Sequence, residues 1–415
     1  MDRFEQLFVT CMSTPLSTGA QAPHKSDCLM GINLNVIGGS GVGKSKRLYN
    51  LGNLMGVPVF PIFTSTKTPE HIGGFPVMTP HGFTLECALP QVRAAIDAGR
   101  AIIFLDEIGS APRAVQAALL SFVNERTIGE YMLPRGVRIV LAMNPADVSA
   151  NGRDLEIPMA NRVLHFQYQP PSLSQWFDFM EDSYDPGVPN LIDSEDIVKR
   201  EWRNHFSTTL GATRDFLEAS GGTIKEKDED GELVSRSKFY DQPSSDSDRA
   251  SGPWPSHRTW HAAVNGVVTA RCLDMPMSVQ TDIIEGLIGK GIAAEWTAYM
   301  KKMNLPKPKD VLTAELTQHQ WPIPKQLDIV RLVLMSATSY AAQETDLHAK
   351  TVFGLAALML LERGGTAGYW DLCVRPFGTL LRAGFDLTHP DLRIQQAAEQ
   401  IATPLTAKGF LKYIR

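Results

Sequence analysis

One eight-residue run constrains the fold of this chain more than any other feature of its sequence. The run consists of Gly38, Gly39, Ser40, Gly41, Val42, Gly43, Lys44 and Ser45. It follows the apolar stretch 32–37 and opens a helix-like segment over 44–55. In such a Gly-rich loop the backbone N–H groups converge on phosphate groups at a helix N-terminus. The lysine neutralises the β/γ oxygens and the hydroxyl serves as a ligand of Mg²⁺. We therefore expect a nucleoside triphosphate here, with Lys44 and Ser45 in these two roles.

Short β-prone runs alternate with helical patterns between residues 31 and 170, which is typical of a parallel sheet flanked by helices. The runs are Ile32–Ile37, Val57–Phe63, Ala101–Leu105, Arg138–Met143 and Val163–Tyr168. The first run is unusual, because Asn33 and Asn35 alternate with apolar residues where a central parallel strand is usually apolar throughout. Two segments that interrupt this alternation, 73–89 and 127–138, have the composition of hairpins. The predicted fold class is α/β.

Two adjacent carboxylates follow the third run. Ala101–Leu105 is apolar and ends in Asp106 and Glu107, so the carboxylates would lie at the tip of a buried strand beside the phosphate loop. Asp106 suits the Mg²⁺ shell, and Glu107 suits polarisation of the water that attacks the γ-phosphorus. By itself the pair also fits a solvated strand end, and the preceding phosphate loop favours the catalytic interpretation.

Three further polar residues are candidates for contacts with the triphosphate. Asn144 ends the fourth run and can orient the attacking water, although an Asn before a Pro is also a common turn. Arg162 precedes the last run and could reach the γ-phosphate of a neighbouring subunit, or form a surface ion pair. Arg258 begins a helix behind the N-cap candidate Ser256 and could sense the triphosphate from a mobile lid.

Composition narrows the class of protein. A chain of 415 residues with 43% hydrophobic and 20% charged residues predicts two or three globular domains. The net charge of −5 gives no global field for nucleic acid. The five cysteines show no pairing or zinc-type spacing. Because no stretch is long and apolar enough for a signal or a membrane span, we expect a cytoplasmic protein.

The pattern along the chain predicts four parts. These are a peripheral lead-in over 1–30, an α/β nucleotide-binding domain over 31–170, a small helical lid over 171–305, and a helical C-terminal region over 306–415. A polar stretch at 220–253 interrupts the lid, and we interpret it as a mobile surface insertion.

These motifs resemble the AAA+ ATPases, and within them the MoxR branch of the helix-2-insert clade, over roughly residues 30–305. The loop and Asp106-Glu107 are similar to Walker A and Walker B, Asn144 to sensor 1, Arg162 to the arginine finger and Arg258 to sensor 2. Met143-Asn144-Pro145, Gly152-Arg153-Asp154-Leu155 and Ala160-Asn161-Arg162 are similar to a MoxR-type stretch. Arg126 and Arg153 are rival candidates for the trans-acting arginine. The insertion at 220–253 is not part of the family pattern.

The resemblance implies an ATPase that uses ATP and Mg²⁺ and forms a ring, for which we expect a hexamer, with ATP between subunits. The hairpins at 75–85 and 130–134 would face a pore or a protein client. MoxR-type proteins remodel clients and commonly pair with a separate protein that carries a von Willebrand factor A domain. Two alternatives stay open: a nucleic-acid-associated AAA+ motor or restriction-type NTPase, and an ATP-controlled oligomeric scaffold.

Overall fold

The structure, a computed structural model, divides into two compact units. It describes residues 1–16, 30–80, 82–86, 89–128, 131–145, 154–169, 172, 187–218, 222–227, 233–243, 251–303, 305–317 and 319–410. The first unit comprises Met1–Arg200 with Ser220–Thr297, and the second comprises Glu201–Ala219 with Ala298–Arg415. The finer division into a lid and a separate C-terminal region stays a prediction.

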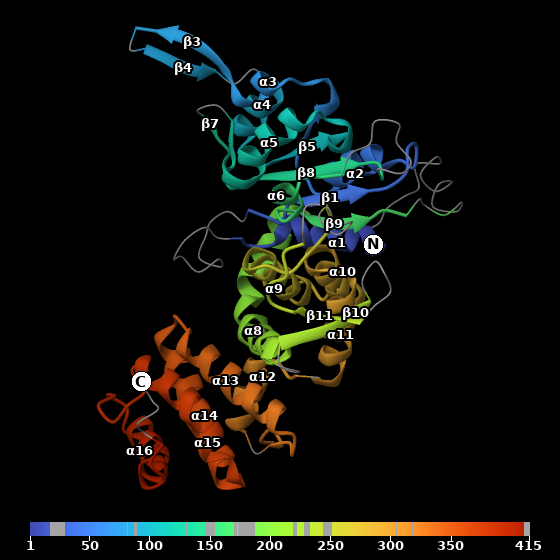
Figure 1. The fold of residues 1–415 in the computed structure, drawn as a ribbon. Coiled ribbons are helices and arrows are strands. Elements are labelled where there is room, and N and C mark those ends of the chain that lie inside the picture. Colours follow the sequence, from blue (N-terminus) through green and yellow to red (C-terminus); the bar gives the residue numbers. More distant parts are fainter. Residues whose placement is uncertain are drawn as a thin grey trace. The chain divides into compact units, whose positions relative to one another are not determined.

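The first unit is built around a five-stranded parallel sheet (Figure 1). Its strands are β1 (Leu34–Ile37), β2 (Val59–Phe63), β5 (Ala101–Asp106), β8 (Val137–Met143) and β9 (Leu164–Gln167). They lie in the order β2-β5-β8-β1-β9, and every neighbouring pair is parallel. All five predicted strands are therefore confirmed. Because all the strands run the same way, their carboxyl ends share one edge of the sheet, and this edge includes the ends of β1, β5 and β8.

Helices surround this sheet within the first unit. They are α1 (Arg3–Ser13), α2 (Lys44–Leu54), α3 (Pro69–Gly73), α4 (Pro90–Ala98), α5 (Arg113–Glu125), α6 (Ile157–Ala160), α9 (His257–Cys272) and α10 (Met277–Ile288). Helix α4 packs on β2 and β5, and α10 packs on β9. The α10–β9 contact is close: a Cβ at Gly286 would lie 2.4 Å from the carbonyl oxygen of His165.

Helix α1 lies in the core rather than at the periphery, where we expected the lead-in. Asp2 caps the helix, and Phe4, Leu7 and Phe8 are almost completely buried. The helix packs against α9 and α10. The short apolar patch of the lead-in is therefore a structural part of the first unit.

Three antiparallel hairpins project from this framework. They are β3 (Phe75–Thr79) with β4 (Gly82–Glu86), β6 (Thr127–Ile128) with β7 (Tyr131–Met132), and β10 (Thr223–Lys227) with β11 (Leu233–Ser237). The first two confirm the predicted hairpins, and β3–β4 extends away from the sheet (Figure 1). The third lies in the stretch that we interpreted as a mobile insertion. The described part of that stretch thus contains regular secondary structure.

The second unit is helical. Its helices are α12 (Pro308–Glu315), α13 (Leu327–Ala342), α14 (Leu347–Gly364), α15 (Trp370–Arg382) and α16 (Leu392–Ala407), and α14 and α15 are joined by a π-helical turn at Gly365–Tyr369. They enclose one apolar cluster that includes Leu334, Leu358 and Phe377. Two long helices, α8 (Leu191–Glu218) and α11 (Lys290–Met303), begin in the first unit and end in the second. None of the described helices meets the length and apolarity of a membrane span.

A buried ion network fixes the amino end of the sheet to α8. Glu195 of α8 accepts from Arg138 of β8 at 2.5 Å and lies 3.1 Å from Arg100, which precedes β5. Arg138 also donates to the carbonyl oxygen of Met12 at 2.6 Å. The side chains of Arg138 and Glu195 are each 1% exposed, so removal of Glu195 would leave the buried charge of Arg138 without this carboxylate.

We expect Glu195→Ala to lower the free energy of unfolding by about 3–5 kcal/mol, because it leaves Arg138 buried without its carboxylate. Urea denaturation followed by circular dichroism measures the change. The matched control is Asp196→Ala, since that side chain is 65% exposed and its removal should change stability by less than about 0.5 kcal/mol. Equal effects of the two substitutions would contradict the network.

Candidate functional site

The loop between β1 and α2 has the geometry of an anion-binding turn. Gly41 and Gly43 have φ values of 76° and 87°, which side chains with a Cβ rarely adopt. Helix α2 begins at Lys44 and has no side-chain hydrogen bond at its N-cap, Gly43. The first N–H groups of the helix therefore remain available for an anion.

The Lys44 ammonium group lies in a ring of oxygen acceptors. Its Nζ donates to the carbonyl oxygens of Gly38 and Gly39 at 2.6 and 2.8 Å and to Oδ1 of Asn144 at 2.9 Å. Burial lowers the pKa of Lys44, and the nearby charge of Asp106 opposes part of that effect. The structure thus brings together two predicted residues, Lys44 and Asn144, that lie 100 positions apart. The carbonyl oxygens occupy positions around Nζ that phosphate oxygens can take over.

Ser45 and Asp106 meet at the same edge of the sheet. Ser45 Oγ donates to Oδ2 of Asp106 at 2.9 Å, and Oδ1 of Asp106 accepts from the N–H of Glu107 at 2.9 Å. A hydroxyl and a carboxylate in contact are suitable oxygen ligands for Mg²⁺, which typically takes one or two carboxylates with phosphates and water. In the described part of the chain no three His, Cys, Asp or Glu side chains cluster to hold a metal ion by themselves. The donor set therefore fits a metal that arrives with phosphate ligands.

Glu107 is exposed and has an unusual backbone conformation. Its φ of 57° and ψ of 35° lie in the left-handed region, which is costly for a residue with a Cβ. Its carboxylate accepts a hydrogen bond from Ser65 Oγ at 2.5 Å. Because of this backbone conformation, the chain leaves the direction of β5 at Glu107, immediately after Asp106. Strain of this kind is common where side-chain position matters for function.

Thr64 and Ser65 are site residues that the sequence analysis missed. They lie in a 3-10 turn, Thr64–Thr66, directly after β2. Thr64 Oγ1 donates to the carbonyl oxygen of Asp106 at 2.8 Å. A signal was present in the sequence, because three consecutive hydroxyl residues follow a strand whose carboxyl end joins the same edge as Asp106.

The two candidate arginines lie together at the opposite edge of the sheet. Arg162 precedes β9, and its carbonyl oxygen accepts from Asn33 at the start of β1. Its neighbour Asn161 accepts from Ser256 Oγ at 3.0 Å, two residues before Arg258. Burial lowers the pKa of Arg162, and repulsion by Arg258 lowers it further. The Ser256–Asn161 hydrogen bond thus brings the start of α9 to the residue that precedes Arg162.

These contacts lie at the amino edge of the sheet, away from the loop. Five residues of extended strand separate Asn33 from Gly38, or roughly 16 Å at about 3.3 Å per residue. The roles of Arg162 toward a neighbouring subunit and of Arg258 as a sensor on a mobile lid both stay predictions.

The structure also bears on the rival arginines. Arg126 is 7% exposed, and its Nη2 donates to the carbonyl oxygens of Pro134 and Val137 at 2.8 and 2.6 Å. These bonds stabilise the base of the β6–β7 hairpin, and the choice among the rival arginines stays a prediction. Arg153 lies outside the described residues.

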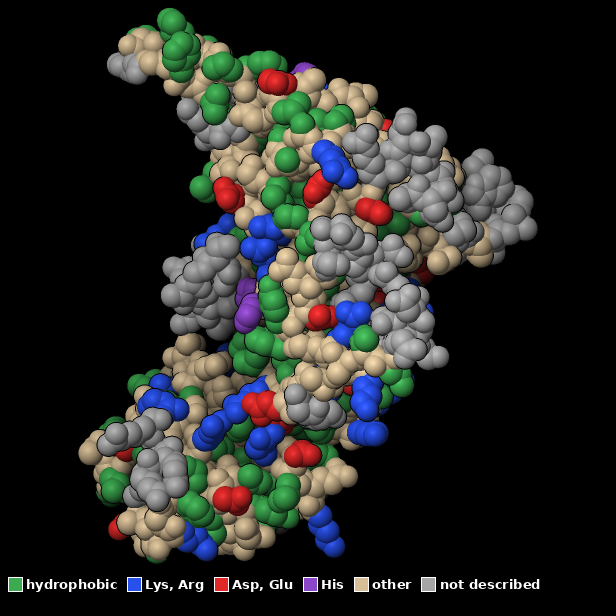
Figure 2. All heavy atoms as spheres, viewed as in Figure 1, with side chains coloured by type: hydrophobic (Ala, Val, Ile, Leu, Met, Phe, Trp, Pro, Cys, Tyr) green, Lys and Arg blue, Asp and Glu red, His purple; other side chains and the backbone are tan. Residues whose placement is uncertain are grey.

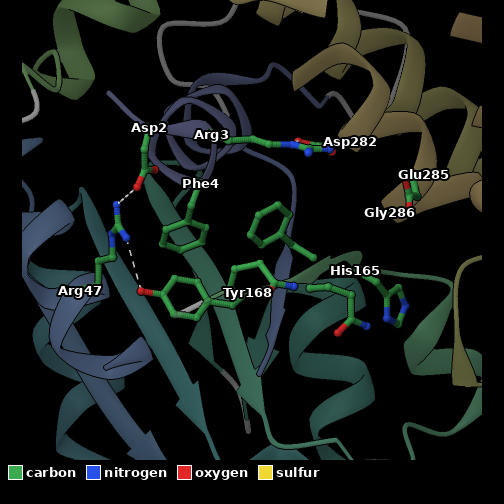
Figure 3. A pocket seen from close by; sticks show the side chains of 12 residues that line it. Asp2, Arg3, Phe4, Arg47, His165, Tyr168, Asp282, Glu285 and Gly286 are labelled. Atoms are coloured by element: carbon green, nitrogen blue, oxygen red, sulfur yellow. Dashed lines mark hydrogen bonds and ion pairs between the residues drawn. The ribbon is translucent and has the colours of Figure 1, made fainter. Parts of the chain in front are cut away.

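A cavity of about 370 Å³ adjoins the α2 side of the loop (Figure 3). Residues from α1, α2, β9 and α10 line it, including Phe4, Arg47, Tyr168 and Glu285. The ring centroids of Phe4 and Tyr168 lie 5.1 Å apart, and Arg47 pairs with Glu5 at 2.6 Å and with Asp2. Tyr168 also borders the loop, because a Cβ at Gly38 would lie 3.1 Å from its carbonyl oxygen. The sequence analysis missed this cavity, since it depends on the unexpected position of α1.

Comparison with known proteins agrees with this geometry. Residues 33–158 match the family model described as AAA domain (dynein-related subfamily). A solved structure from Cytophaga hutchinsonii, described as "a putative ATPase", is similar with a TM-score of 0.41 and 14% sequence identity. The alignment covers 73% of this chain and 88% of that one. No curated protein matches the chain. The match of the family model shows an AAA domain over residues 33–158, and such a domain implies ATP binding.

We expect Glu107→Gly to be more stable than Glu107→Ala by about 1 kcal/mol, because only glycine relieves the left-handed backbone strain. The two variants lose the same carboxylate and the same hydrogen bond to Ser65. The difference between their free energies of unfolding therefore measures the backbone strain alone. Thermal and urea unfolding of both variants measure it. A glycine variant no more stable than the alanine variant would show that the turn is unstrained.

Proposed function

We propose that this chain is a Mg²⁺-dependent ATPase of the MoxR branch, built on its AAA domain, that couples ATP hydrolysis to the remodelling of a protein client. The observation that carries the proposal is the convergence of four polar groups at the carboxyl edge of the sheet. Lys44 contacts Asn144, and Ser45 contacts Asp106. Glu107 lies immediately beside them.

Each group has a role that follows from its position. The loop N–H groups and Lys44 would bind the β- and γ-phosphates, and Lys44 would exchange its carbonyl contacts for phosphate oxygens. Ser45 and Asp106 would hold Mg²⁺ with the nucleotide. When bound, the ion supplies positive charge that stabilises the phosphate oxygens during transfer. Asn144 would turn its amide toward the attacking water once Lys44 shifts.

Glu107 is the candidate base that polarises this water. In the structure Ser65 donates to its carboxylate, so part of its acceptor capacity is occupied. Release of that bond would free the carboxylate to face the water. The short contact between Ser65 and Glu107 therefore supports a resting site whose base must reorient before hydrolysis.

We further propose that the complete site lies between two copies of the chain. Contacts of Asn33 and Ser256 hold Arg162 and its neighbour Asn161 at the amino edge of the sheet, and neither Arg162 nor Arg258 makes an ion pair with a carboxylate among the described residues. A γ-phosphate of an adjacent copy would supply the anion that both lack. Such head-to-tail contacts close into rings, and a hexamer is the size that we propose.

The cavity beside the loop provides a place for the base of the nucleotide. The phosphates would lie at the N-terminus of α2, and Arg47, three residues after Lys44, is part of the cavity lining. Phe4 and Tyr168 supply aromatic surface (Figure 3), and Glu285 and Gln167 supply polar groups at its wall. An aromatic wall and a few polar groups are the usual composition of a base-binding pocket.

The β3–β4 hairpin supports a protein as the client. Met78 and Phe83 pair across its strands and are 75% and 73% exposed. With Pro76 and Leu85, which also pair, they form one wholly apolar face of the ribbon. Figure 2 shows hydrophobic side chains on the surface of this projection. An apolar face of this kind fits an extended, apolar polypeptide, and a separate protein with a von Willebrand factor A domain is the partner that we propose for client delivery.

We expect Glu107→Gln to retain ATP binding and to lose at least about 100-fold in turnover, since an amide cannot accept the proton of the attacking water. A fluorescent ATP analogue measures binding and phosphate release measures turnover. Glu399→Gln is the matched control, because Glu399 is exposed on α16 in the second unit, outside the site. Normal turnover by Glu107→Gln would refute the assignment of the base.

We expect Met78→Ser/Phe83→Ser to weaken binding of a reduced, carboxymethylated polypeptide by at least about tenfold, because the apolar face of the ribbon is lost. Fluorescence anisotropy of the labelled polypeptide measures the affinity. Basal turnover should stay within about twofold, as the ribbon is not part of the nucleotide site. The control is Leu392→Ser, since Leu392 is 68% exposed in the second unit. If wild-type protein does not bind the polypeptide, the hairpin has another role.

A further inference from the structure

The helical second unit contains a cavity of about 540 Å³, which we name the second-unit cavity. Residues of α8, α13 and α15 line it, together with Phe410, which follows α16. The lining combines buried apolar side chains, such as Leu332 and Val374, with the exposed charged side chains of Asp371 and Arg375. Binding sites for small molecules and short peptides typically have volumes of about 300–1,000 Å³ and this mixed composition. The cavity is therefore a candidate binding site in a unit to which we have assigned no function.

One buried carboxylate oxygen in the wall of this cavity has no partner. Oδ1 of Asp215 pairs with Arg331, whereas Oδ2 makes no hydrogen bond to any described residue. The side chain of Asp215 is only 8% exposed, and burial raises its pKa while the hydrogen bond from Arg331 opposes that effect. A buried acceptor without a donor costs free energy. A ligand that brings a donor group to Oδ2 would remove this cost.

A proline in α15 leaves a second acceptor in the wall. Pro376 lies inside the helix and has no N–H, so the carbonyl oxygen of Leu372, four residues earlier, lacks its usual helical donor. Both residues line the cavity. The wall thus contains two acceptors, Asp215 Oδ2 and the carbonyl oxygen of Leu372, that a ligand with N–H groups could satisfy.

The charges of the wall are partly paired. The charged lining residues are Arg214, Asp215, Arg331, Asp371 and Arg375. Asp215 is paired with Arg331, and Nε of Arg214 lies 2.9 Å from Glu218. Arg375 makes no ion pair within the part of the chain that the structure describes. Its charge, with those of Arg214 and Arg331, lowers the pKa of Glu218, so the three arginines lie near one another. Arg375 is therefore the cation of this wall that a carboxylate of a ligand could use.

This lining discriminates among classes of ligand. A fatty acid could pair with Arg375, but it has no donor for Oδ2 of Asp215. A nucleic acid or a polyphosphate would meet the carboxylates of Asp215 and Asp371, and Asp328 adds negative charge near Asp215. A polypeptide segment supplies N–H donors, apolar side chains and a single carboxylate within a few residues. The combination of acceptors, apolar surface and one available arginine therefore favours a peptide.

We propose that the second-unit cavity binds a short segment of a partner protein, an apolar peptide that carries an acidic side chain. Its backbone N–H groups would donate to Asp215 Oδ2 and to the carbonyl oxygen of Leu372, and its carboxylate would pair with Arg375. Its apolar side chains would cover Leu332 and Met335 in the wall. The inference is independent of the proposed function, because every residue that carries it belongs to the second unit.

Selection from a library of random heptapeptides displayed on phage tests this proposal without a known partner. The full-length wild-type chain and Arg375→Glu are used as targets in parallel. Lys309→Glu is the matched control, because Lys309 is exposed on α12 and does not line the cavity. We expect wild type and Lys309→Glu to enrich apolar peptides that contain Asp or Glu, and Arg375→Glu not to enrich them.

An enriched peptide, labelled with fluorescein, then gives the affinity by fluorescence anisotropy. We expect Arg375→Glu to weaken binding by at least about tenfold. Met335→Trp should have the same effect, since it places a larger side chain in the cavity at a position that is only partly buried. Lys309→Glu should stay within about twofold of wild type. Unchanged thermal unfolding, followed by circular dichroism, shows that the variants are folded.

Three results would overturn the proposal. The first is that wild type enriches no peptide that Arg375→Glu fails to enrich. The second is that the peptides that depend on Arg375 are basic. The third is an equal loss of affinity in Lys309→Glu, which would indicate attraction by the overall charge of the unit. ATP turnover of the wild-type chain, measured separately, tests the proposed function and does not bear on this site.

Discussion

The parallel pairing of β5, β8 and β1 is the constraint on which the rest of the structure depends. Three strands that run the same way must present their carboxyl ends at one edge and their amino ends at the other. This rule brings the phosphate loop after β1, the acid pair after β5 and Asn144 after β8 to one place. Hydrogen bonds from Lys44 and Ser45 then fix the side chains that the pairing has already assembled. The proximity of these side chains therefore depends on the parallel direction of the strands more than on any single hydrogen bond.

The same constraint separates the proposed site residues between the two edges of the sheet. The residues that we propose to bind and polarise the triphosphate lie at the carboxyl edge, whereas the contacts of Asn161 and Arg162 lie at the amino edge. Asn33 links this second group to the central strand, since its side chain donates to the carbonyl oxygens of Val123 and Arg162. These bonds account for Asn33, one of the two asparagines that interrupt the apolar residues of this segment.

Much of the sheet and of the residues at its carboxyl edge could be predicted from the sequence, because each of these features is encoded within a short segment. The glycines of the loop, the apolar strand before Asp106 and the strand before Asn144 each stand in a short window of residues. The helical lead-in, the role of Ser65 and the pairing of Arg258 with Arg162 could not be predicted. They depend on contacts between segments far apart in the chain, and periodicity carries no information on such contacts. The described part of the polar stretch at 220–253 shows the same limit. Its composition is that of a mobile loop, yet Trp260 and Pro255 anchor part of it.

The most direct test of a nucleotide site that is shared between two copies of the chain is an experiment in which two variants are mixed. Lys44→Ala removes the phosphate contact from one chain, and Arg162→Ala removes the arginine from another, so each variant alone should be inactive. Turnover of an equimolar mixture is then compared with that of each variant and of wild type. If the arginine acts on the adjacent copy, one interface in four regains both groups and the mixture should recover about a quarter of wild-type turnover. A mixture as inactive as its components would contradict the account and would place Lys44 and Arg162 in the same site of one chain.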